Sequence, residues 1–557
     1  MLTRREFLAA STAGGAVAAM HSGALAQTSA KHSRTRDAIP PTSPTPVSAR
    51  PSEHPGGTTV NVGSSPGDLQ TQINLAINAD GTHKGNTLVC PAGVTYDPIT
   101  LPPTTGPGWT CIRSGSGALP ARGVRVVPTN ANTMFKVRSL GGSATNPSAS
   151  AVAVRVPTHG WRFIGMEATH SNASDQYAVV SLEGDTSSRL SFERCYIHPF
   201  DGKQANSARG IWAAGVNELQ VWDSWIEGRC IVNGLTDAQA IALRRGSRTH
   251  IENNLLQGTT ENVLLGDQNS GGPCVDVTIK RNHLFKPLTW SQFLLTDGTT
   301  PNPTWDGVHW LVKNCFEIKW ATRMLFEGNV CENTWPPGQP GDILVFNGGR
   351  QPSGLDAIGT DCMIRSNKFL NGTNGFTVNM NVPGGVPNLR CAIVNNLFLG
   401  IRGRAWNFGH AGIDIWVEHN TIVPVTGTGS NFSSFTNYIA PDTPSSFPRL
   451  TIKRNVFGHS RYGVTVPPDG AGTPTRRVWD LMLPDRSFAE NAEFGASGSY
   501  PDGITMYASA AAAGLNTSTG ELNARSPLLK SGSDGKALGV DFAELSAALT
   551  GTADRGA

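Results

Sequence analysis

One short pattern of apolar and polar positions recurs along the chain. It reads apolar, any, any, Asn, any, apolar, as in Ile251-Glu-Asn-Asn254-Leu-Leu256. The polar positions of nine copies are Cys195, Ser224, Asn254, Asn282, Asn329, Asn367, Asn396, Asn420 and Asn455. Successive positions are 29, 30, 28, 47, 38, 29, 24 and 35 residues apart. A fixed pattern at such a period predicts one structural unit per copy, and units this short must stack to bury a core.

A second short apolar run precedes most copies, as in Ala240-Ile-Ala-Leu-Arg-Arg245. Each unit is therefore predicted to contain a strand, a tight turn, a strand ending at the Asn, and a third strand. Parallel pairing of successive units, at about 4.8 Å, brings the Asn side chains together at one corner. The pattern predicts an all-β fold, a single solenoid of about 10 or more rungs with an internal Asn ladder. Asn314, only 15 residues before Asn329, does not fit this ladder.

The regions outside the repeats differ in composition. Residues 27–58 are rich in Ser, Thr and Pro and predict a disordered linker. Residues 68–77 have one apolar helical face and predict a helix that caps the first rung, with Asp68 as N-cap. The predicted parts are a cap with the first rungs at 59–118, the solenoid at 119–465, inserted loops at 289–308 and 333–359, and a turn-rich C-terminal cap at 466–557 with a short helix at 543–549. Inserted loops often gather on a binding face.

The first residues include Thr3-Arg4-Arg5-Glu6-Phe7-Leu8, followed by a weakly apolar run and Ala24-Leu25-Ala26. Residues 1–26 resemble a twin-arginine signal peptide that is cut before Gln27. The resemblance implies the twin-arginine export machinery as a partner and a periplasmic or extracellular location. No later apolar stretch reaches 18 residues, so no membrane insertion of the mature chain is predicted.

Charge and cysteine content narrow the possible partners. The formal net charge is +3, and removal of residues 1–26 leaves +2, which gives no electrostatic case for binding nucleic acid. Several of the nine cysteines fall in register with the repeat, which indicates small buried residues rather than a disulfide framework. Cys90 and Cys111 form the best candidate disulfide. No C-x-x-C motif occurs, so the sequence predicts no structural zinc site.

The Asn pattern resembles the right-handed parallel β-helix of the pectate-lyase superfamily, over roughly residues 60–550. Arg281-Asn-His-Leu-Phe-Lys-Pro-Leu-Thr-Trp290 and Phe326-Glu-Gly-Asn-Val-Cys-Glu-Asn333 are similar to a bacterial secreted subfamily of that superfamily. The superfamily contains polysaccharide lyases, glycoside hydrolases, epimerases and non-catalytic spikes. The resemblance therefore implies the fold and leaves the function open.

In related folds the substrate lies along the outward face of the first strand of each rung and the adjoining loops. Alternation along these strands selects the candidate residues here. The catalytic candidates are Asp237, Glu261, Arg244 and Lys319. The substrate-binding candidates are Trp212, Gln239, Asp267, Lys286 and Glu317, with Trp212 as a platform for sugar stacking. Glu193, Glu252, Lys280, Glu327 and Arg365 on the second strands are interpreted as a mixed-charge exterior without function.

Two chemistries fit these residues. β-Elimination on a uronic acid needs a base, a cation that neutralises the carboxylate and an acid; Arg244, Lys319 and Lys286 are the basic candidates. Hydrolysis needs two carboxylates, which Asp237, Glu261, Asp267 and Glu317 offer. The sequence favours a lyase acting on an acidic polysaccharide, with glycoside hydrolysis on the same face and a non-catalytic glycan-binding or adhesion β-helix as alternatives. Calcium is compatible with oxygens from Asp237, Glu261 and Asp267, but no metal site is assigned.

Overall fold

The computed structural model describes residues 37–552 except for 48, 116, 118, 140–148, 171–175, 201–206, 235–236, 268–270, 337, 351–355, 381–387, 409–411, 426–434, 438–448, 460–463, 466–475, 477–479, 481–484, 496–499 and 501. The chain divides into residues 1–35 and residues 36–557, and all statements below concern the described part of the second unit. The predicted signal peptide lies outside the described residues.

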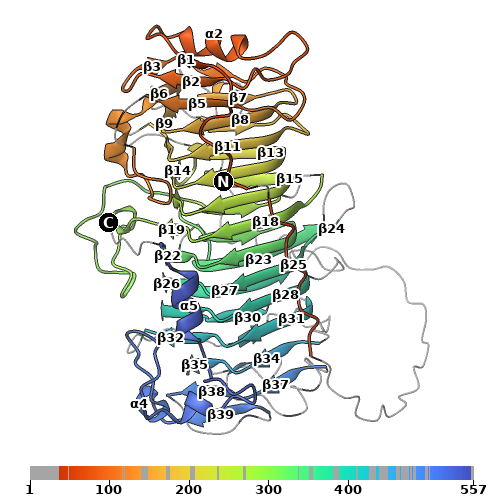
Figure 1. Ribbon diagram of the computed structural model, residues 1–557. Helices are drawn as coiled ribbons and strands as arrows, with labels where there is room; N and C mark the ends of the chain where they lie inside the picture. The colour runs from red at the N-terminus through yellow and green to blue at the C-terminus, as the bar shows by residue number, and fades with distance from the viewer. Residues whose placement is uncertain are drawn as a thin grey trace, which may run out of the picture. The chain divides into compact units, whose positions relative to one another are not determined.

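Three parallel sheets make up a β-helix in which each rung adds one strand to each sheet (Figure 1). The first sheet contains β4 (Ile99–Thr100), β7 (Val152–Val154), β10 (Ala178–Leu182), the start of β13 (Ser207–Trp222), the start of β15 (Ile241–Glu252), β17 (Val263–Leu265), β20 (Phe316–Ile318), β23 (Asp342–Arg350), β27 (Asn374–Met380), β30 (Trp406–Phe408), β33 (Phe435–Asn437) and β36 (Val464–Thr465).

The second sheet contains β1 (Thr59–Asn61), β2 (Thr87–Cys90), β5 (Thr110–Ser114), β8 (His159–Ile164), β11 (Ser188–Glu193), the ends of β13 and β15, β18 (Cys274–Lys280), β21 (Ala321–Glu327), β25 (Gly359–Arg365), β28 (Asn388–Val394), β31 (Gly412–Glu418), β34 (Thr451–Lys453) and β37 (Ser487–Ala489). β13 and β15 bend from the first sheet into the second, which joins the two sheets.

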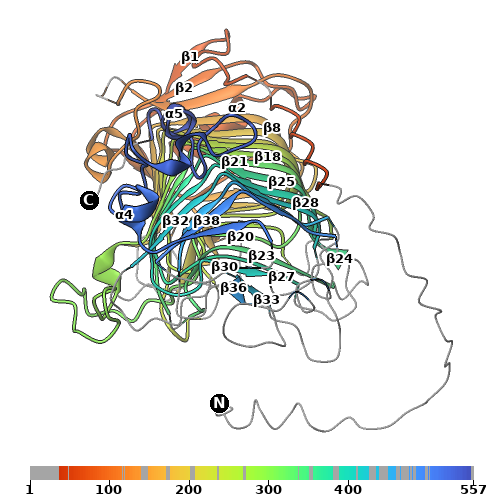
Figure 2. The ribbon, with the colours of Figure 1, turned by 90° about the horizontal axis from the view of Figure 1, so that it is seen from below.

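The third sheet contains β3 (Thr95–Tyr96), β6 (Phe135–Ser139), β9 (Met166–His170), β12 (Tyr196–Ile197), β14 (Trp225–Cys230), β16 (Leu255–Gly258), β19 (His283–Phe285), β22 (Val330–Thr334), β26 (Lys368–Gly372), β29 (Leu397–Ile401), β32 (Thr421–Pro424), β35 (Val456–Gly458), β38 (Asn491–Phe494) and β39 (Ile504–Tyr507). Viewed along the stack, strands of successive rungs lie over one another (Figure 2). The predicted parallel β-helix is confirmed.

The core consists of inward side chains that stack from rung to rung. One buried cluster extends from Val62 to Phe457 and includes the apolar positions of the repeated pattern. Phe316 stacks on Phe326 with ring centroids 4.4 Å apart, and Phe369 stacks on Phe398 at 4.6 Å. Each such side chain contributes roughly 1.5–3 kcal/mol by burial.

The asparagines of the pattern lie at the corner between the second and third sheets. Oδ1 of Asn329 accepts from the backbone N–H of Asn282 at 2.9 Å and from its Nδ2 at 3.0 Å. The same two bonds join successive asparagines from Asn254 to Asn491. Asn314 lies outside this ladder, and its Nδ2 donates to Glu317 at 3.1 Å.

Strand pairing continues past the predicted boundary at residue 465, because β37 and β38 add to the second and third sheets. Asn491 is the ladder member of this rung. The sequence pattern misses it because Glu493 occupies an apolar position. Glu493 is buried there and accepts from His459 Nδ1 at 2.6 Å when that nitrogen carries the proton.

The prediction of a disordered linker is wrong for residues 37–47 and 49–58. These residues extend along the outer face of the second sheet and bond to it repeatedly, from Ala38, whose N–H donates to Thr451 Oγ1 at 2.8 Å, to Glu53, which accepts from Arg113 at 3.2 Å (red in Figure 1). Glu193, predicted to be exterior, is fully buried beneath them.

The described helices are short. α2 (Asp68–Leu75) packs Leu69 and Ile73 on the first strands; its N-cap is Gly67, so Asp68 lies in the first turn. α4 (Ala510–Ala513) and α5 (Phe542–Ala548) lie near the C-terminus, and 3₁₀ turns cover Pro128–Thr133, Leu288–Trp290 and Pro527–Lys530. None of the helices in the described ranges is long and apolar enough to cross a membrane.

Two further expectations need correction. The predicted loop at 333–359 contains β23, a full strand of the first sheet, whose end pairs antiparallel with β24 (Asp356–Ala357). Cys90 and Cys111 are not bonded: Cys111 lies opposite Thr87, three residues from Cys90. All nine cysteines are free and buried, as the repeat register indicated.

Candidate functional site

The outward face of the first sheet presents its side chains in rows. Ladder pairing places Trp212, Ala242, Leu264, Glu317 and Val345 opposite one another on successive rungs. Counting three residues back along each rung gives a second row: Arg209, Gln239, Glu261, Asn314 and Asp342. Polar side chains from neighbouring rungs therefore meet at the edge where the chain enters the first sheet.

Two carboxylates at this edge share one cation. Lys313 Nζ lies 2.6 Å from Asp237 Oδ2 and 3.7 Å from Glu261 Oε1. Gln239 Nε2 donates to the other oxygen of Glu261 at 2.7 Å. Glu261 is 1% exposed, whereas 39% of the Asp237 side chain is exposed. Burial alone would lower the pKa of Lys313, but Glu261 and Asp237 outweigh it and raise that pKa.

Glu317 is a third carboxylate, one rung further along. The amides of Asn314 and Asn347 each donate to one of its oxygens at 3.1 Å, and Lys319 Nζ lies 3.6 Å away. The Glu317 side chain is 1% exposed. The structure thus brings together Asp237, Gln239 and Glu261, and places Glu317 with Lys319 on the next rung.

Arg209 is a member of the site that the sequence reasoning missed. Its guanidinium carbon lies 4.7 Å from the ring centroid of Trp212 and 4.9 Å from that of Tyr177, and its Nε donates to Gln239 at 3.1 Å. Burial lowers the pKa of Arg209. Since Arg209 lies three residues before Trp212, as Gln239 lies three before Ala242, row counting would have found it.

The proposed sugar platform at Trp212 is wrong. The side chain is only 6% exposed, the Arg209 guanidinium covers its ring, and Nε1 donates to Glu183 at 2.9 Å. Tyr177 packs edge-on against the same ring at 5.7 Å. This aromatic group therefore holds Arg209 in place.

Lys286 is also not a substrate-binding residue. It is fully buried, and its ammonium donates to the carbonyls of Gly258, Thr259 and Thr260. Burial lowers its pKa to about 8. Lys286 therefore stabilises the turn that precedes Glu261 from the interior of the β-helix.

Arg244 lies within β15, just past its part in the first sheet, and Asp267 follows β17, so neither is at the edge where the chain enters this sheet. Arg244 Nε is 3.1 Å from Asp267 Oδ2, and both side chains are partly exposed. Asp267 is thus paired with a cation while Asp237 and Glu261 share another. The three carboxylates considered for calcium do not form one ligand set, and the described ranges contain no group of three or more metal-binding side chains.

The inserted loop predicted at 289–308 forms a cavity of about 710 Å³ with its neighbours. Its aromatic lining is Trp290, Phe293, Trp305, His309, Trp310 and Trp335. Trp290 and Trp310 pack with centroids 5.9 Å apart, and Trp310 Nε1 donates to Asp306 at 2.9 Å. Trp310 precedes Lys313 by three residues, at most about 10 Å along an extended chain, while Asp237 and Glu261 do not themselves line the cavity.

No family model and no curated protein matches the chain. Solved structures that resemble it include the catalytic unit of a GH87 alpha-1,3-glucanase from Streptomyces thermodiastaticus strain HF3-3, with 12% identity, TM-score 0.42 and coverage of 83% of this chain and 69% of that one. Pectate lyase Pel9A matches with 12% identity, TM-score 0.37 and coverage of 86% and 95%. PfbA, a surface adhesin of Streptococcus pneumoniae, matches with 10% identity, TM-score 0.37 and coverage of 82% and 90%. All are parallel β-helix proteins, as this chain is.

Proposed function

We propose that the chain is an exported enzyme that cleaves a polysaccharide by glycoside hydrolysis at the edge of the first sheet. The observation that carries the proposal is the pair Asp237 and Glu261, held on either side of Lys313. Glycoside hydrolysis uses two carboxyl groups, one to protonate the leaving oxygen and one to act on the opposite side of the sugar. Carbohydrate-active proteins among the similar structures agree with this class.

The two carboxyl groups differ in exposure, which suggests separate roles. Asp237 reaches solvent, and we assign it the activation of water. Glu261 is fixed through Oε2 by Gln239, and we assign its Oε1, which lies 3.7 Å from Lys313 Nζ, the protonation of the leaving oxygen. Lys313 positions both groups. The aromatic cavity beside the pair supports the binding of sugar rings, because rings of Trp and Phe stack on the apolar faces of sugars.

β-Elimination, which the sequence favours, has less support from the geometry than hydrolysis. A lyase base must reach the proton next to the substrate carboxylate, and none of the three basic candidates is placed for this. Arg244 pairs with Asp267 and Lys319 lies beside Glu317, while Lys286 is enclosed. One observation favours elimination as a second candidate: burial lowers the pKa of Arg209, which directly contacts Gln239.

The decisive experiment is incubation with a panel of neutral and acidic polysaccharides, following both new reducing ends and ultraviolet absorbance of a new C=C bond. Hydrolysis predicts reducing ends without absorbance, and E261Q and D237N should each lower the rate at least about 100-fold. D185N, at a carboxylate that is 62% exposed and pairs with Arg245 in the turn after β10, is the matched control and should keep the rate. New ultraviolet absorbance would show that the reaction is elimination and not hydrolysis. Binding of a polysaccharide without any product would indicate an adhesion protein.

A further inference from the structure

The N-terminal segment at residues 37–47 and 49–55, which we call the strap, crosses the outer face of the second sheet. It extends over eleven strands, β34, β31, β28, β25, β21, β18, β15, β13, β11, β8 and β5. At its beginning, Asp37 pairs with Lys453 at 2.6 Å. The strap is therefore built onto a face far from the carboxylate pair, and the inference below does not rest on the proposed function.

Charged residues alternate in a single column along the second sheet, and the strap contacts three of them, Asp276, Asp361 and Asp414. The column is Arg189, Glu218, Arg248, Asp276, Arg323, Asp361, Arg390, Asp414 and Arg449. The residues beside its first eight members are in register from strand to strand, and Arg449 pairs with Asp414. Each member has a positive φ, between 51° and 58°, so the same left-handed backbone position recurs on every rung. Each also lies six residues before the polar position of its repeat.

The arginines of this column fix its aspartates. Arg323 holds Asp276 through two bonds of 2.6 and 2.9 Å, and Arg390 holds Asp361 at 2.7 and 2.8 Å. Arg449 holds Asp414 in the same way. Such bidentate pairs orient the carboxylate strongly. The fixed oxygens remain able to accept one more hydrogen bond each.

The strap supplies that bond at every third residue. The backbone N–H groups of Thr45, Thr42 and Ile39 donate to Oδ1 of Asp276, Asp361 and Asp414, at 2.8, 3.0 and 3.0 Å. Successive aspartates are two strands apart, about 9.6 Å. Three residues of a polyproline II helix span about 9.3 Å. The two repeats match, which explains why one extended chain can bond to alternate rungs.

The prolines of the strap are placed in agreement with a donor at every third residue. Pro40, Pro41 and Pro44 lie between the three donors, Pro46 follows the last of them, and none falls on a donor position. Proline has no N–H and favours the extended polyproline conformation. From Ile39 to Pro46 the strap therefore has proline wherever an N–H is not needed for the column, apart from Ser43, which is exposed.

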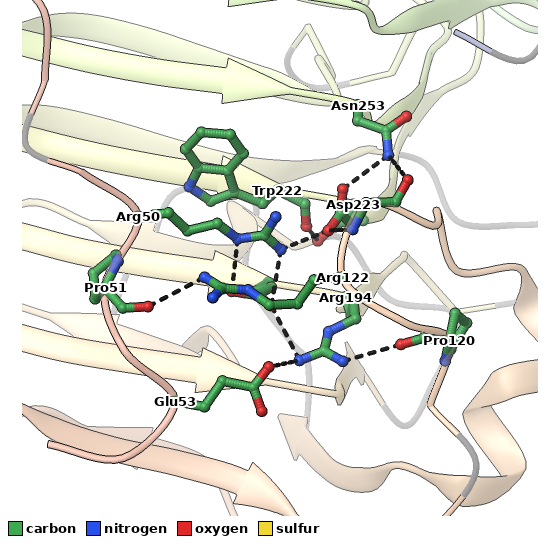
Figure 3. A network of polar contacts seen from close by, with 12 residues as sticks. Arg50, Pro51, Glu53, Pro120, Arg122, Arg194, Trp222, Asp223 and Asn253 are labelled. Carbon is green, nitrogen blue, oxygen red and sulfur yellow. Dashed lines mark hydrogen bonds and ion pairs between the residues drawn. The ribbon is translucent and has the colours of Figure 1, made fainter. Parts of the chain in front are cut away.

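A second set of contacts anchors the far end of the strap (Figure 3). Arg50 lies over the ring of Trp222 at 5.0 Å and bonds to Glu193 and Asp223 at 3.0 and 2.5 Å. Arg162 donates to the carbonyls of Pro51 and Ser52. Glu53 accepts from Arg194. These groups hold the strap through its backbone and two charged side chains.

We propose that the alternating column is a binding site for an extended proline-rich peptide, and that residues 38–47 are the ligand it holds in this chain. The site recognises a backbone N–H at every third residue and accepts proline at the positions between. Binding through fixed carboxylates makes the strap a separable ligand, not a structural strand of the sheet.

The test uses the full chain with a site-specific protease sequence inserted between Pro55 and Gly56, where the chain is accessible. After cleavage the strap should stay bound, and excess labelled peptide of residues 37–55 should replace it, measured by fluorescence anisotropy. The T42P and T45P peptides should each bind about 10- to 100-fold more weakly, because each loses one bond to a charged acceptor. The S43P peptide is the matched control and should bind like the parent.

Equal weakening by S43P and T42P would overturn the proposal, as would loss of the cleaved strap without rebinding of the peptide. Hydrogen exchange on the uncut protein provides an independent measurement. The amides of Ile39, Thr42 and Thr45 should be protected, and that of Ser43 should exchange at the rate of an unstructured peptide. Uniform fast exchange across the four amides would also contradict the site.

Discussion

At the residue scale, the ammonium of Lys286 is enclosed by main-chain carbonyls and has no exposed surface. Burial disfavours its charged form and lowers its pKa to about 8. In the unfolded chain the pKa returns to about 10.4. Between these values the unfolded state binds the extra proton, so the stability of the folded protein rises with pH.

We therefore expect the free energy of unfolding of the natural protein to gain on the order of 3 kcal/mol from Lys286 between pH 8 and pH 10.5. The K286M variant should lack this gain, because methionine does not titrate. Urea unfolding of both proteins at several pH values in that window measures the difference. Parallel pH profiles would show that Lys286 keeps an ordinary pKa in the folded protein.

At the element scale, each member of the Asn ladder satisfies groups on two other rungs. Asn367 accepts two bonds from Asn329 and donates to the carbonyls of Phe326 and Arg365. N367A would leave all of these buried groups without that partner. Each unsatisfied group costs about 1–3 kcal/mol, so a loss of about 3–5 kcal/mol in unfolding free energy is expected.

Urea denaturation checks this value, with N132A at an exposed asparagine as the control that should change stability by less than about 0.5 kcal/mol. A loss below about 1 kcal/mol for N367A would mean that water replaces the ladder bonds.

The strap should respond to acid. The Arg323 bonds, together with the Thr45 N–H, hold the pKa of Asp276 below its usual range. Burial would raise the pKa of Asp361 and Asp414, but Arg390 and Arg449, with the strap N–H groups, lower both. For a depressed carboxyl pKa, the stabilisation is complete above the unfolded value near 3.8 and disappears as pH falls through the folded value.

Strap binding is therefore expected to be constant from pH 7 to about pH 4 and to weaken below about pH 3.8. Hydrogen exchange at Thr42, corrected for the intrinsic pH dependence of exchange, measures it. Loss of protection already between pH 7 and pH 5 would show that groups other than these aspartates hold the strap.

How far the sequence predicts this molecule depends on which contacts the repeated pattern encodes. Periodicity locates the strands, the Asn corner and the edge of the first sheet, because stacking forces equivalent residues into rows. The charged column also follows the repeat, since each member lies six residues before a polar position. Its members were recognised as a group only in the structure. Arg209 lies in a row that such counting reaches, whereas the role of Lys313 depends on which carboxylates the neighbouring rungs place beside it.

The strap escapes for a different physical reason. Its composition is that of a disordered segment, since it cannot bury apolar side chains of its own. Its order comes from hydrogen bonds between its backbone and aspartates that are 231, 319 and 375 residues away in sequence. No local pattern carries that information.

At the scale of the whole molecule, the proposed export depends on Arg4 and Arg5. Replacement of both by Lys keeps the charge but should block translocation, because the signal is read by a receptor and not by charge alone. Cell fractionation with an antibody to the chain measures the location. Continued export of the R4K/R5K variant would refute the twin-arginine assignment and leave the solenoid unaffected.

The strap also has a consequence for the order of events during synthesis. Residues 38–45 leave the ribosome early, yet the Ala38 N–H cannot bond to Thr451 until that residue is made, 413 residues later. At about 5–20 residues per second, that delay is tens of seconds. A proline-rich segment suits such a wait, because it has few N–H groups with which to join a growing sheet edge. Docking of its first residues then marks the completion of the rungs through residue 451.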